Sequence, residues 1–240
     1  MTKSEIQRII QSYLSKQFSC KETDLFGEEI VFTKNLIKKP YIKMMTYKEC
    51  TVVNISEDLY SSVKEELKGR NRDEIFEYPL VYGQTIHFVP DVRLIYEPVL
   101  ADAYTYELLE GDRIKELSYI RGFDNSLAFN EEGETITQIV FVVKKENEVI
   151  AIAGASAEHE KMWEVGIDVM PEYRNAGLGN AMVRHLSLEI LKKNIVPFYS
   201  ASVTNIGSQM VASRAGYIPC WVDTFGNVFD EYYAYDYKKE

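Results

Sequence analysis

The sequence predicts an α+β protein of layered strands and helices, with an N-terminal α+β subdomain over residues 1–100 and a second domain over residues 101–240. Two observations define the second domain. Residues 162–169 alternate apolar and polar side chains as a strand does, and residues 178–194 space apolar side chains as a helix does. A turn with two glycines joins these two patterns, whereas the first hundred residues contain strand and helix patterns without such a turn.

The N-terminal subdomain begins with an amphipathic helix. A capping-box pattern at Ser4 precedes apolar residues at helical spacing as far as Phe18. Residues 41–55 predict one or two strands, and Ser56 is placed to cap a helix that Gly69 ends. Together these patterns predict an α+β class for the subdomain.

Cysteine content and hydropathy limit the class of protein. No apolar run reaches the ~20 residues that a membrane span needs, and the first helix is too polar for a signal peptide. Cys20, Cys50 and Cys220 are widely separated, which gives neither a disulfide framework nor a metal-ligand pattern. We therefore expect a cytoplasmic protein that binds neither a metal nor a membrane.

Charge is unevenly distributed along the chain. Residues 1–100 carry 14 Lys and Arg against 15 Asp and Glu, whereas residues 101–240 carry 13 against 22. An acidic second domain argues against binding to nucleic acid and favours a cationic partner such as an amine, a polyamine or a basic peptide. Acidity also serves solubility alone, so the alternative that it marks no ligand stays open.

The turn within residues 173–183 is suited to hold a phosphate. Gly177 and Gly179 lack a Cβ, so the chain can turn sharply and bring backbone N–H groups close to a ligand. The following helix directs its positive dipole end and its unpaired N–H groups to the same point, and Arg174 adds a cation suited to a pyrophosphate. The residues expected to contact the ligand here are Arg174, Asn175, Ala176, Gly177, Leu178, Gly179 and Asn180.

Three kinds of site place such a turn between a strand and a helix: a P-loop, a dinucleotide site and an acyl-CoA site. A P-loop needs Lys and Ser or Thr after its last glycine, where Asn180 and Ala181 stand. A dinucleotide fingerprint needs a third glycine where Met182 stands, and a carboxylate about twenty residues on, where Tyr199 and Ser200 stand. The P-loop is excluded, and the dinucleotide fingerprint is incomplete.

The remaining pattern resembles the acetyl-CoA signature of the GCN5-related N-acetyltransferase (GNAT) superfamily, R/Q-x-x-G-x-G/A, with Arg174, Gly177 and Gly179 in register. A second block is also similar to that superfamily, because Asn205 opens a helix that a Gly–aromatic pair closes at residues 216–217. The whole chain, with its extra N-terminal half, resembles a bacterial subgroup of long acetyltransferases.

The resemblance covers about residues 101–240 and implies the GNAT fold, a mixed, mostly antiparallel sheet with helices on both faces. It implies a helical region at residues 112–120 and a hairpin around residues 146–148. The strands that it implies lie at residues 104–110, 138–144, 149–156, 162–169, 198–203 and 231–237.

The resemblance also implies acetyl-CoA as co-substrate and direct acetyl transfer to an amine in a ternary complex. Backbone groups from Ile167 to Val169 would hold the pantetheine arm and the acetyl carbonyl. Asn205 and Ser208 would contact the same arm, although each is also placed to cap or line its helix.

Two carboxylates are candidates for the base that takes the proton of the amine. Glu164 and Asp168 share one face of the predicted strand, and Glu164 is preferred because Asp168 lies nearer the cofactor arm. The alternative that either carboxylate only faces solvent or pairs with a lysine stays open. His159 and His185 are interpreted as structural, and Cys220 has no histidine spaced to activate it.

The chain departs from the usual pattern at the acid that protonates the leaving thiolate. Many members place a tyrosine four residues before the Gly–aromatic pair, and that position is Ala212. Tyrosines at positions 232, 233, 235 and 237 could supply a phenol, but alternation in a terminal strand favours packing. The acid is therefore left unassigned.

Three functions fit these patterns. The first is an N-acetyltransferase for a small, cationic primary amine. The second is a non-catalytic acyl-CoA-binding protein that regulates a partner, which the missing tyrosine favours. The third is a protein or peptide N-acetyltransferase, which needs an open acceptor groove.

Overall fold

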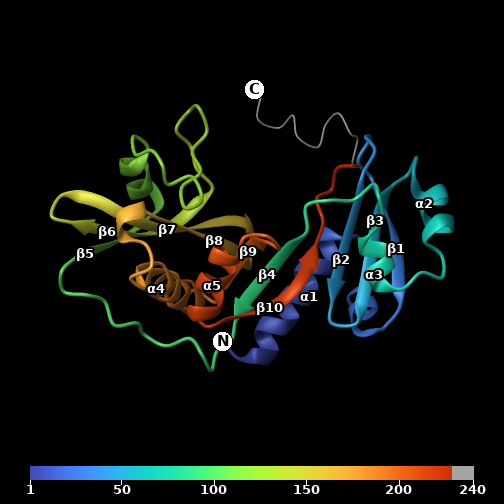
Figure 1. The fold of residues 1–240 in the computed structure, drawn as a ribbon, viewed down its shortest axis with the longest axis horizontal. Helices are drawn as coiled ribbons and strands as arrows, with labels where there is room; N and C mark the ends of the chain where they lie inside the picture. Colours follow the sequence, from blue (N-terminus) through green and yellow to red (C-terminus); the bar gives the residue numbers. More distant parts are fainter. Residues whose placement is uncertain (229–240) are drawn as a thin grey trace. The chain divides into compact units, whose positions relative to one another are not determined.

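The computed structural model describes residues 1–228, which form two compact units, and the strand expected at residues 231–237 lies outside them (Figure 1). Unit 1 comprises Met1–Ile9 and Phe88–Pro219, and unit 2 comprises Ile10–His87 and the residues from Cys220. The units interleave along the chain, whereas the sequence patterns suggested one division near residue 100.

The chain passes between the units inside three regular elements. These are helix α1 (Lys3–Gln17) and strands β4 (Thr85–Pro90) and β10 (Tyr217–Asp223). Helix α1 and strand β10 begin in unit 1 and end in unit 2. Strand β10 therefore brings the chain back to unit 2, which contains residues 10–87.

Unit 1 is built on a sheet in which four successive strands pair antiparallel and a fifth joins in parallel. Strands β5, β6, β7 and β8 pair in chain order, and β9 pairs with β8. Their bounds are β5 (Thr105–Glu110), β6 (Thr137–Lys145), β7 (Glu148–His159), β8 (Met162–Val169) and β9 (Val196–Ser202).

Helical elements cover both faces of this sheet. The short helix η2 (Gly111–Leu117) packs with Ile152 of β7 in one apolar cluster. Side chains alternate between the faces along a strand, so Ala151 and Ala153 point the other way, where helix α4 (Leu178–Lys192) contacts β7 and β8. The predicted mixed, mostly antiparallel sheet with helices on both faces is confirmed.

Two further elements of unit 1 lie near the glycine-containing turn before helix α4. A short helix, η3 (Pro171–Tyr173), follows β8, and helix α5 (Ile206–Arg214) follows β9. Gly177 is the residue before α4 and has a φ of 83°. This left-handed conformation is costly for most residues with a Cβ, so the turn itself favours a glycine at this position.

Unit 2 has a sheet of its own. Strand β1 (Ile30–Asn35) pairs parallel with β3 (Cys50–Ser56), which pairs antiparallel with β2 (Ile42–Tyr47), and β2 pairs antiparallel with β10. Besides the end of α1, the unit contains the helices η1 (Glu22–Phe26), α2 (Tyr60–Leu67) and α3 (Arg72–Phe76). The N-terminal half is therefore α+β as predicted, and residues 41–55 form two strands.

Two predicted helix caps were wrong. Helix α1 begins at Lys3, where Thr2 and Glu5 exchange backbone-to-side-chain hydrogen bonds of 2.7 and 3.2 Å, instead of at Ser4. Ser56 ends β3, and its Oγ accepts a hydrogen bond from the N–H of Tyr41 at 3.0 Å. Because that hydroxyl is already used by the sheet, α2 begins later, at Tyr60.

Candidate active site

Strands β8 and β9 separate before either one ends. Their parallel pairing runs from Met162 with Val196 to Glu164 with Phe198, whereas β8 continues to Val169. The other edge of β8 stays paired with β7 as far as Val169. Beyond Glu164, β8 therefore has an open edge that faces the gap left by β9.

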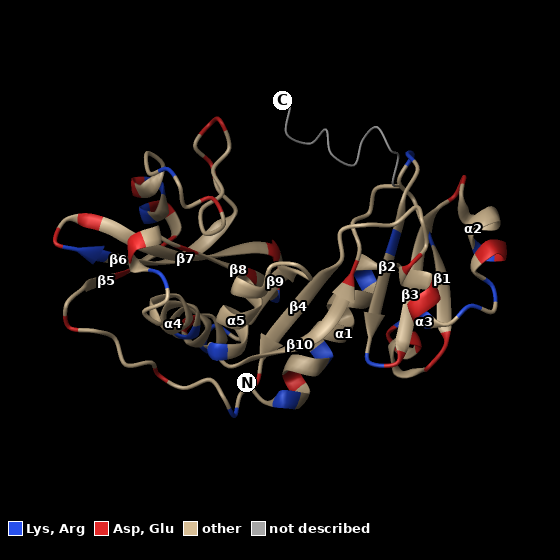
Figure 2. Cartoon of the chain, in the orientation of Figure 1, with Lys and Arg blue, Asp and Glu red and all other residues tan. Residues whose placement is uncertain are grey.

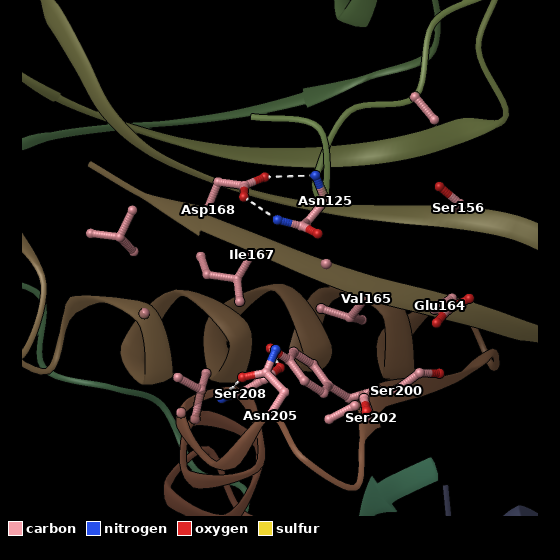
Figure 3. A pocket seen from close by; sticks show the side chains of 18 of the residues that line it. Asn125, Ser156, Glu164, Val165, Ile167, Asp168, Ser200, Ser202, Asn205 and Ser208 are labelled. Carbon is pink, nitrogen blue, oxygen red and sulfur yellow. Dashed lines mark hydrogen bonds between the residues drawn. The ribbon is translucent and has the colours of Figure 1, made fainter. Parts of the chain in front are cut away.

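A cavity of about 680 Å³ lies along this open edge. Its walls come from β8 and β9, from the turn before α4, from α5, and from the segment before β6 (Figure 3). Among residues 1–228, the lining includes the carboxylates Glu158, Glu164 and Asp168 and the cation Arg174. A site of this size, with polar groups on several elements, can hold a small ligand.

The backbone of β8 offers hydrogen-bonding groups to the cavity at alternate residues. The N–H of Met170 donates to the carbonyl of Ile150 in β7. Because the N–H and C=O groups of successive residues point to opposite sides of a strand, those of Val165, Ile167 and Val169 point to the open edge. The carbonyl of Val169 accepts a hydrogen bond from Arg174 Nε at 2.8 Å, which leaves its N–H for a ligand.

The turn before α4 presents further donors. The N–H groups of Leu178, Gly179 and Asn180 lie in the first turn of the helix, where no preceding helical carbonyl can accept from them. Arg174 and Asn175 line the cavity beside them, and Asn175 has a φ of 63°. A turn with these donors, a cation and the positive end of a helix dipole fits a pyrophosphate.

The backbone conformation that favours glycine at position 177 does not explain the glycine at position 179. A Cβ at Gly179 would lie 3.6 Å from Val169 Cγ2 and 3.7 Å from Ile167 Cγ1, which are ordinary contact distances. The folded chain therefore does not require glycine here. This is consistent with the expectation that its backbone approaches a ligand.

Glu164 lies on the opposite face of β8 from Ile167 and Val169, because side chains alternate along a strand. Its register partner on β7 is Ser156, and both side chains line the cavity. Within the described part of the chain, the carboxylate of Glu164 has no hydrogen-bond or ion-pair partner. It is thus available to a ligand at the open edge.

Asp168 shares this face but is fully engaged. Its Oδ2 accepts hydrogen bonds from the N–H groups of Asn125 and Ser126, both at 2.9 Å, and from Ser126 Oγ at 2.6 Å. Its Oδ1 accepts from the side-chain amide of Asn125, as the dashed lines of Figure 3 show. The two candidate carboxylates therefore differ, since Glu164 is unpartnered and Asp168 binds a neighbouring loop.

A pair of hydroxyl groups lies on the α5 side of the open edge. Tyr199 OH and Ser208 Oγ are 2.8 Å apart, and both residues line the cavity. Asn205 accepts a hydrogen bond from the N–H of Ser208 at 3.1 Å, so it caps α5 and also lines the cavity. Burial raises the pKa of Tyr199 above that of a free phenol, which is itself protonated at neutral pH.

The structure brings most of the expected site residues to one cavity. Glu164, Ile167, Asp168, Val169, Arg174, Asn175, Gly179, Asn205 and Ser208 line it, whereas Ala176, Gly177, Leu178 and Asn180 belong to the same turn without lining the cavity. Ala212 is fully buried, and the tyrosines at 232, 233, 235 and 237 lie outside the described residues.

The sequence analysis did not identify Asn125, Ser126 or Tyr199. The glycines at 154 and 166 were a usable signal for the first two, because a glycine inside a strand often marks a close approach by another backbone. His185 packs against Phe141 and bonds to Glu97, away from the cavity lining.

No group of three or more His, Cys, Asp or Glu side chains in residues 1–228 is placed to hold a metal ion. None of the helices in this part of the chain has the length and apolar character to cross a membrane.

Comparison with known families agrees with this geometry. Residues 105–220 match the family model of the GNAT acetyltransferases. The match runs from β5 into β10 and contains the open edge, the turn before α4 and helix α5. Residues 105–220 thus form a domain of the GNAT acetyltransferases, a family whose general activity is acetyl transfer. Among curated protein sequences, none matches the chain.

Several solved structures are similar to part of the chain. A GNAT-family acetyltransferase from Novosphingobium aromaticivorans has 14% identity and a TM-score of 0.45 over 62% of this chain and 66% of its own. A GNAT-family acetyltransferase from Colwellia psychrerythraea has 10% sequence identity and a TM-score of 0.44, over 61% of this chain and 56% of its own. A GCN5-related N-acetyltransferase-like protein from Streptococcus suis has 17% sequence identity and a TM-score of 0.46, over 72% of this chain and 70% of its own. The chain thus spans less than two-thirds of the first two proteins.

Proposed function

We propose that the protein is an acetyl-CoA-dependent N-acetyltransferase that acetylates a primary amine of a small, cationic acceptor by direct attack in a ternary complex. The observation that supports this most is the open edge of β8 between a phosphate-binding turn and an unpartnered carboxylate. Each of these three features serves one part of the reaction.

The turn and the open edge would hold acetyl-CoA. Arg174 and the N–H groups of Gly179 and Asn180 suit its pyrophosphate, and the edge groups of Val165 and Ile167 suit the amides of its pantetheine arm. Bound acetyl-CoA would supply an activated acetyl group as a thioester. The free N–H of Val169 is a donor for the carbonyl oxygen on which charge develops.

Glu164 would act as the base. An ammonium group cannot attack a carbonyl, so the acceptor must lose a proton before or during attack. Glu164 has no partner in residues 1–228 and lies on the face of β8 opposite to the turn, where an acceptor can approach without meeting the cofactor. Positioned carboxylates of this kind typically contribute about 10²–10⁴-fold to rate.

The hydroxyl pair of Tyr199 and Ser208 would donate a proton to the departing sulfur. It lies on the same side of the open edge as α5, and a phenol carries its proton at neutral pH, so Tyr199 has a proton to donate. The positive end of the α5 dipole stabilises negative charge at the same place. This pair would take the role that Ala212 cannot fill.

The charge of the acceptor side favours a cation. Glu158 and Glu164 both line the cavity. The loop at residues 130–134, between Ala128 and Ile136 of the lining, carries three more acids, visible as red in Figure 2. Such a field raises the local concentration of cations and their rate of association.

A matched pair of amines tests this proposal. 1,5-Diaminopentane and pentylamine have the same chain and the same reacting group, but only the diamine carries a second positive charge. With acetyl-CoA as donor and thiol release as readout, we expect turnover of the diamine with a kcat/KM at least tenfold above that of pentylamine. Salt should weaken this preference.

Other outcomes would change the proposal. Equal kcat/KM values for the two amines would contradict the preference for a cationic acceptor but would still support an N-acetyltransferase. Binding of acetyl-CoA without turnover of amines or of lysine-containing peptides would favour the non-catalytic acyl-CoA-binding protein. Turnover of peptides alone would favour a peptide N-acetyltransferase.

A further inference from the structure

We infer that Asp168 is a positioning residue, which fixes the loop at residues 123–129 as the acceptor-side wall of the cavity and so controls what reaches the open edge of β8. This segment is called the wall loop below. The inference rests on the proposed function, because the molecule that the wall admits is the acceptor of that reaction.

The contacts of Asp168 hold the backbone of the wall loop directly. Two of its four hydrogen bonds come from backbone N–H groups of Asn125 and Ser126, and two from their side chains. Hydrogen bonds to an ionised carboxylate are stronger than those between neutral groups. The single hydroxyl proton of Ser126 is shared between Asp168 Oδ2 and the carbonyl of Ile152, whose oxygen lies 2.8 Å from Oγ, so the loop contacts β7 as well as β8.

Two glycines permit this approach. Gly154 and Gly166 are register partners on β7 and β8. A Cβ at Gly154 would lie 1.9 Å from Ser126 O, and a Cβ at Gly166 would lie 1.7 Å from Asn125 O. Both contacts are with loop backbone, so any larger residue must displace the wall loop from the sheet.

Apolar contacts fix the two ends of the same segment. Phe123 and Leu127 are buried in the core cluster that contains Leu109 and Ile152. The loop therefore has an apolar anchor in the core and a polar anchor at Asp168, with its backbone pressed on the glycine pair. Ordinary surface loops lack such fixation, which is what a wall of defined shape requires.

The position of the loop makes it the wall on the acceptor side. Asn125 and Ala128 line the cavity on the face of β8 that carries Glu164, and Figure 3 shows Asn125 and Asp168 across β8 from Asn205 and Ser208. The phosphate-binding turn lies on the other face. A displaced wall would therefore leave the cofactor contacts intact and open the acceptor side to solvent.

Asp168→Ala, which removes all four acceptor contacts, tests the inference. Hydrogen exchange of the amides at residues 123–129 should become at least tenfold faster, while the Kd for acetyl-CoA stays within twofold of wild type. The KM for 1,5-diaminopentane should rise at least tenfold, and thiol release without amine should rise severalfold because water reaches the thioester.

Other variants separate this effect from a general loss of structure. Gly166→Ala displaces the same loop by a steric clash on the same face of β8 and should reproduce the effects, whereas Asp168→Asn retains one acceptor oxygen and should be intermediate. Asp112→Ala removes an exposed carboxylate of unit 1, and Gly27→Ala adds a Cβ with no neighbour closer than 3.7 Å, so both should behave as wild type.

Two results would overturn the inference. If the loop amides of Asp168→Ala exchange as slowly as those of wild type, Asp168 does not hold the loop. If they exchange faster while the KM for the diamine and the amine-free thiol release are unchanged, the loop is not the acceptor wall. Failure of the wild type to bind acetyl-CoA would instead refute the proposed function, and the exchange result would still decide whether Asp168 fixes the loop.

Discussion

Replacing Glu164 with glutamine tests the assignment of the base, because the amide keeps the size of the side chain and loses its ability to accept a proton. The carboxylate is partly exposed, so water can take over part of its role, and we expect the lower end of the usual range, about 100-fold in kcat. That factor corresponds to about 2.7 kcal/mol of transition-state stabilisation. The rate is measured as thiol release from saturating acetyl-CoA with 1,5-diaminopentane.

A binding measurement distinguishes loss of the base from loss of structure. Glu164 lies across β8 from the turn before α4, so the Kd of Glu164→Gln for acetyl-CoA should stay within twofold of wild type. Glu160→Gln is the matched control, since Glu160 is exposed and outside the cavity lining. A kcat for Glu164→Gln within threefold of wild type would refute the assignment.

Two further predictions concern titratable groups. Tyr199→Phe removes the phenol bonded to Ser208, and we expect kcat to fall about 10- to 100-fold with unchanged acetyl-CoA affinity; normal turnover would exclude Tyr199 as the proton donor. Burial raises the thiol pKa of Cys50 to about 11 and that of Cys220 to about 12, so the unfolded chain loses these protons first. The contribution of these two thiols to the free energy of unfolding should therefore be constant below about pH 8 and fall as pH rises toward 11, as denaturant titrations at alkaline pH would show. Cys50→Ala should reduce this slope, and an equal slope in the variant would contradict the explanation.

Local patterns were sufficient to predict the main elements around the site. Strand β8 and helix α4 followed from the spacing of apolar residues, and the turn between them from its glycines and Arg174. These signals lie within some thirty residues of one another, so no knowledge of distant pairing is needed. The resemblance of the same residues to the GNAT signature then gave the class of fold.

Features that depend on distant residues were missed or misplaced. Ser56 has the sequence pattern of a helix cap, but its hydroxyl accepts a hydrogen bond from the N–H of Tyr41, fifteen residues earlier. The return of β10 to unit 2 depends on pairing Trp221 with Tyr47, which no local pattern reveals. Asp168 resembled a second catalytic carboxylate because its partners, more than forty residues away, were invisible in the sequence.

The central claim is that the turn before α4 binds the pyrophosphate of acetyl-CoA, and an isosteric change of charge tests it. Asn175→Asp adds one negative charge at a residue that lines the cavity, and Asp tolerates the φ of 63° there about as well as Asn. At roughly 5 Å and an effective dielectric constant between those of water and the protein surface, repulsion by a phosphate costs about 1.4–3 kcal/mol, or about 10- to 150-fold in affinity. Asn194→Asp is the matched control, because Asn194 is also exposed with a positive φ of 57° and lies beyond the other end of α4.

The most direct measurement is therefore a calorimetric titration of wild type, Asn175→Asp and Asn194→Asp with acetyl-CoA. We expect micromolar binding by wild type and by Asn194→Asp, and binding weaker by at least tenfold in Asn175→Asp. Equal affinities for all three proteins would place the cofactor elsewhere, and no binding by wild type would contradict the assignment of this cavity to acetyl transfer.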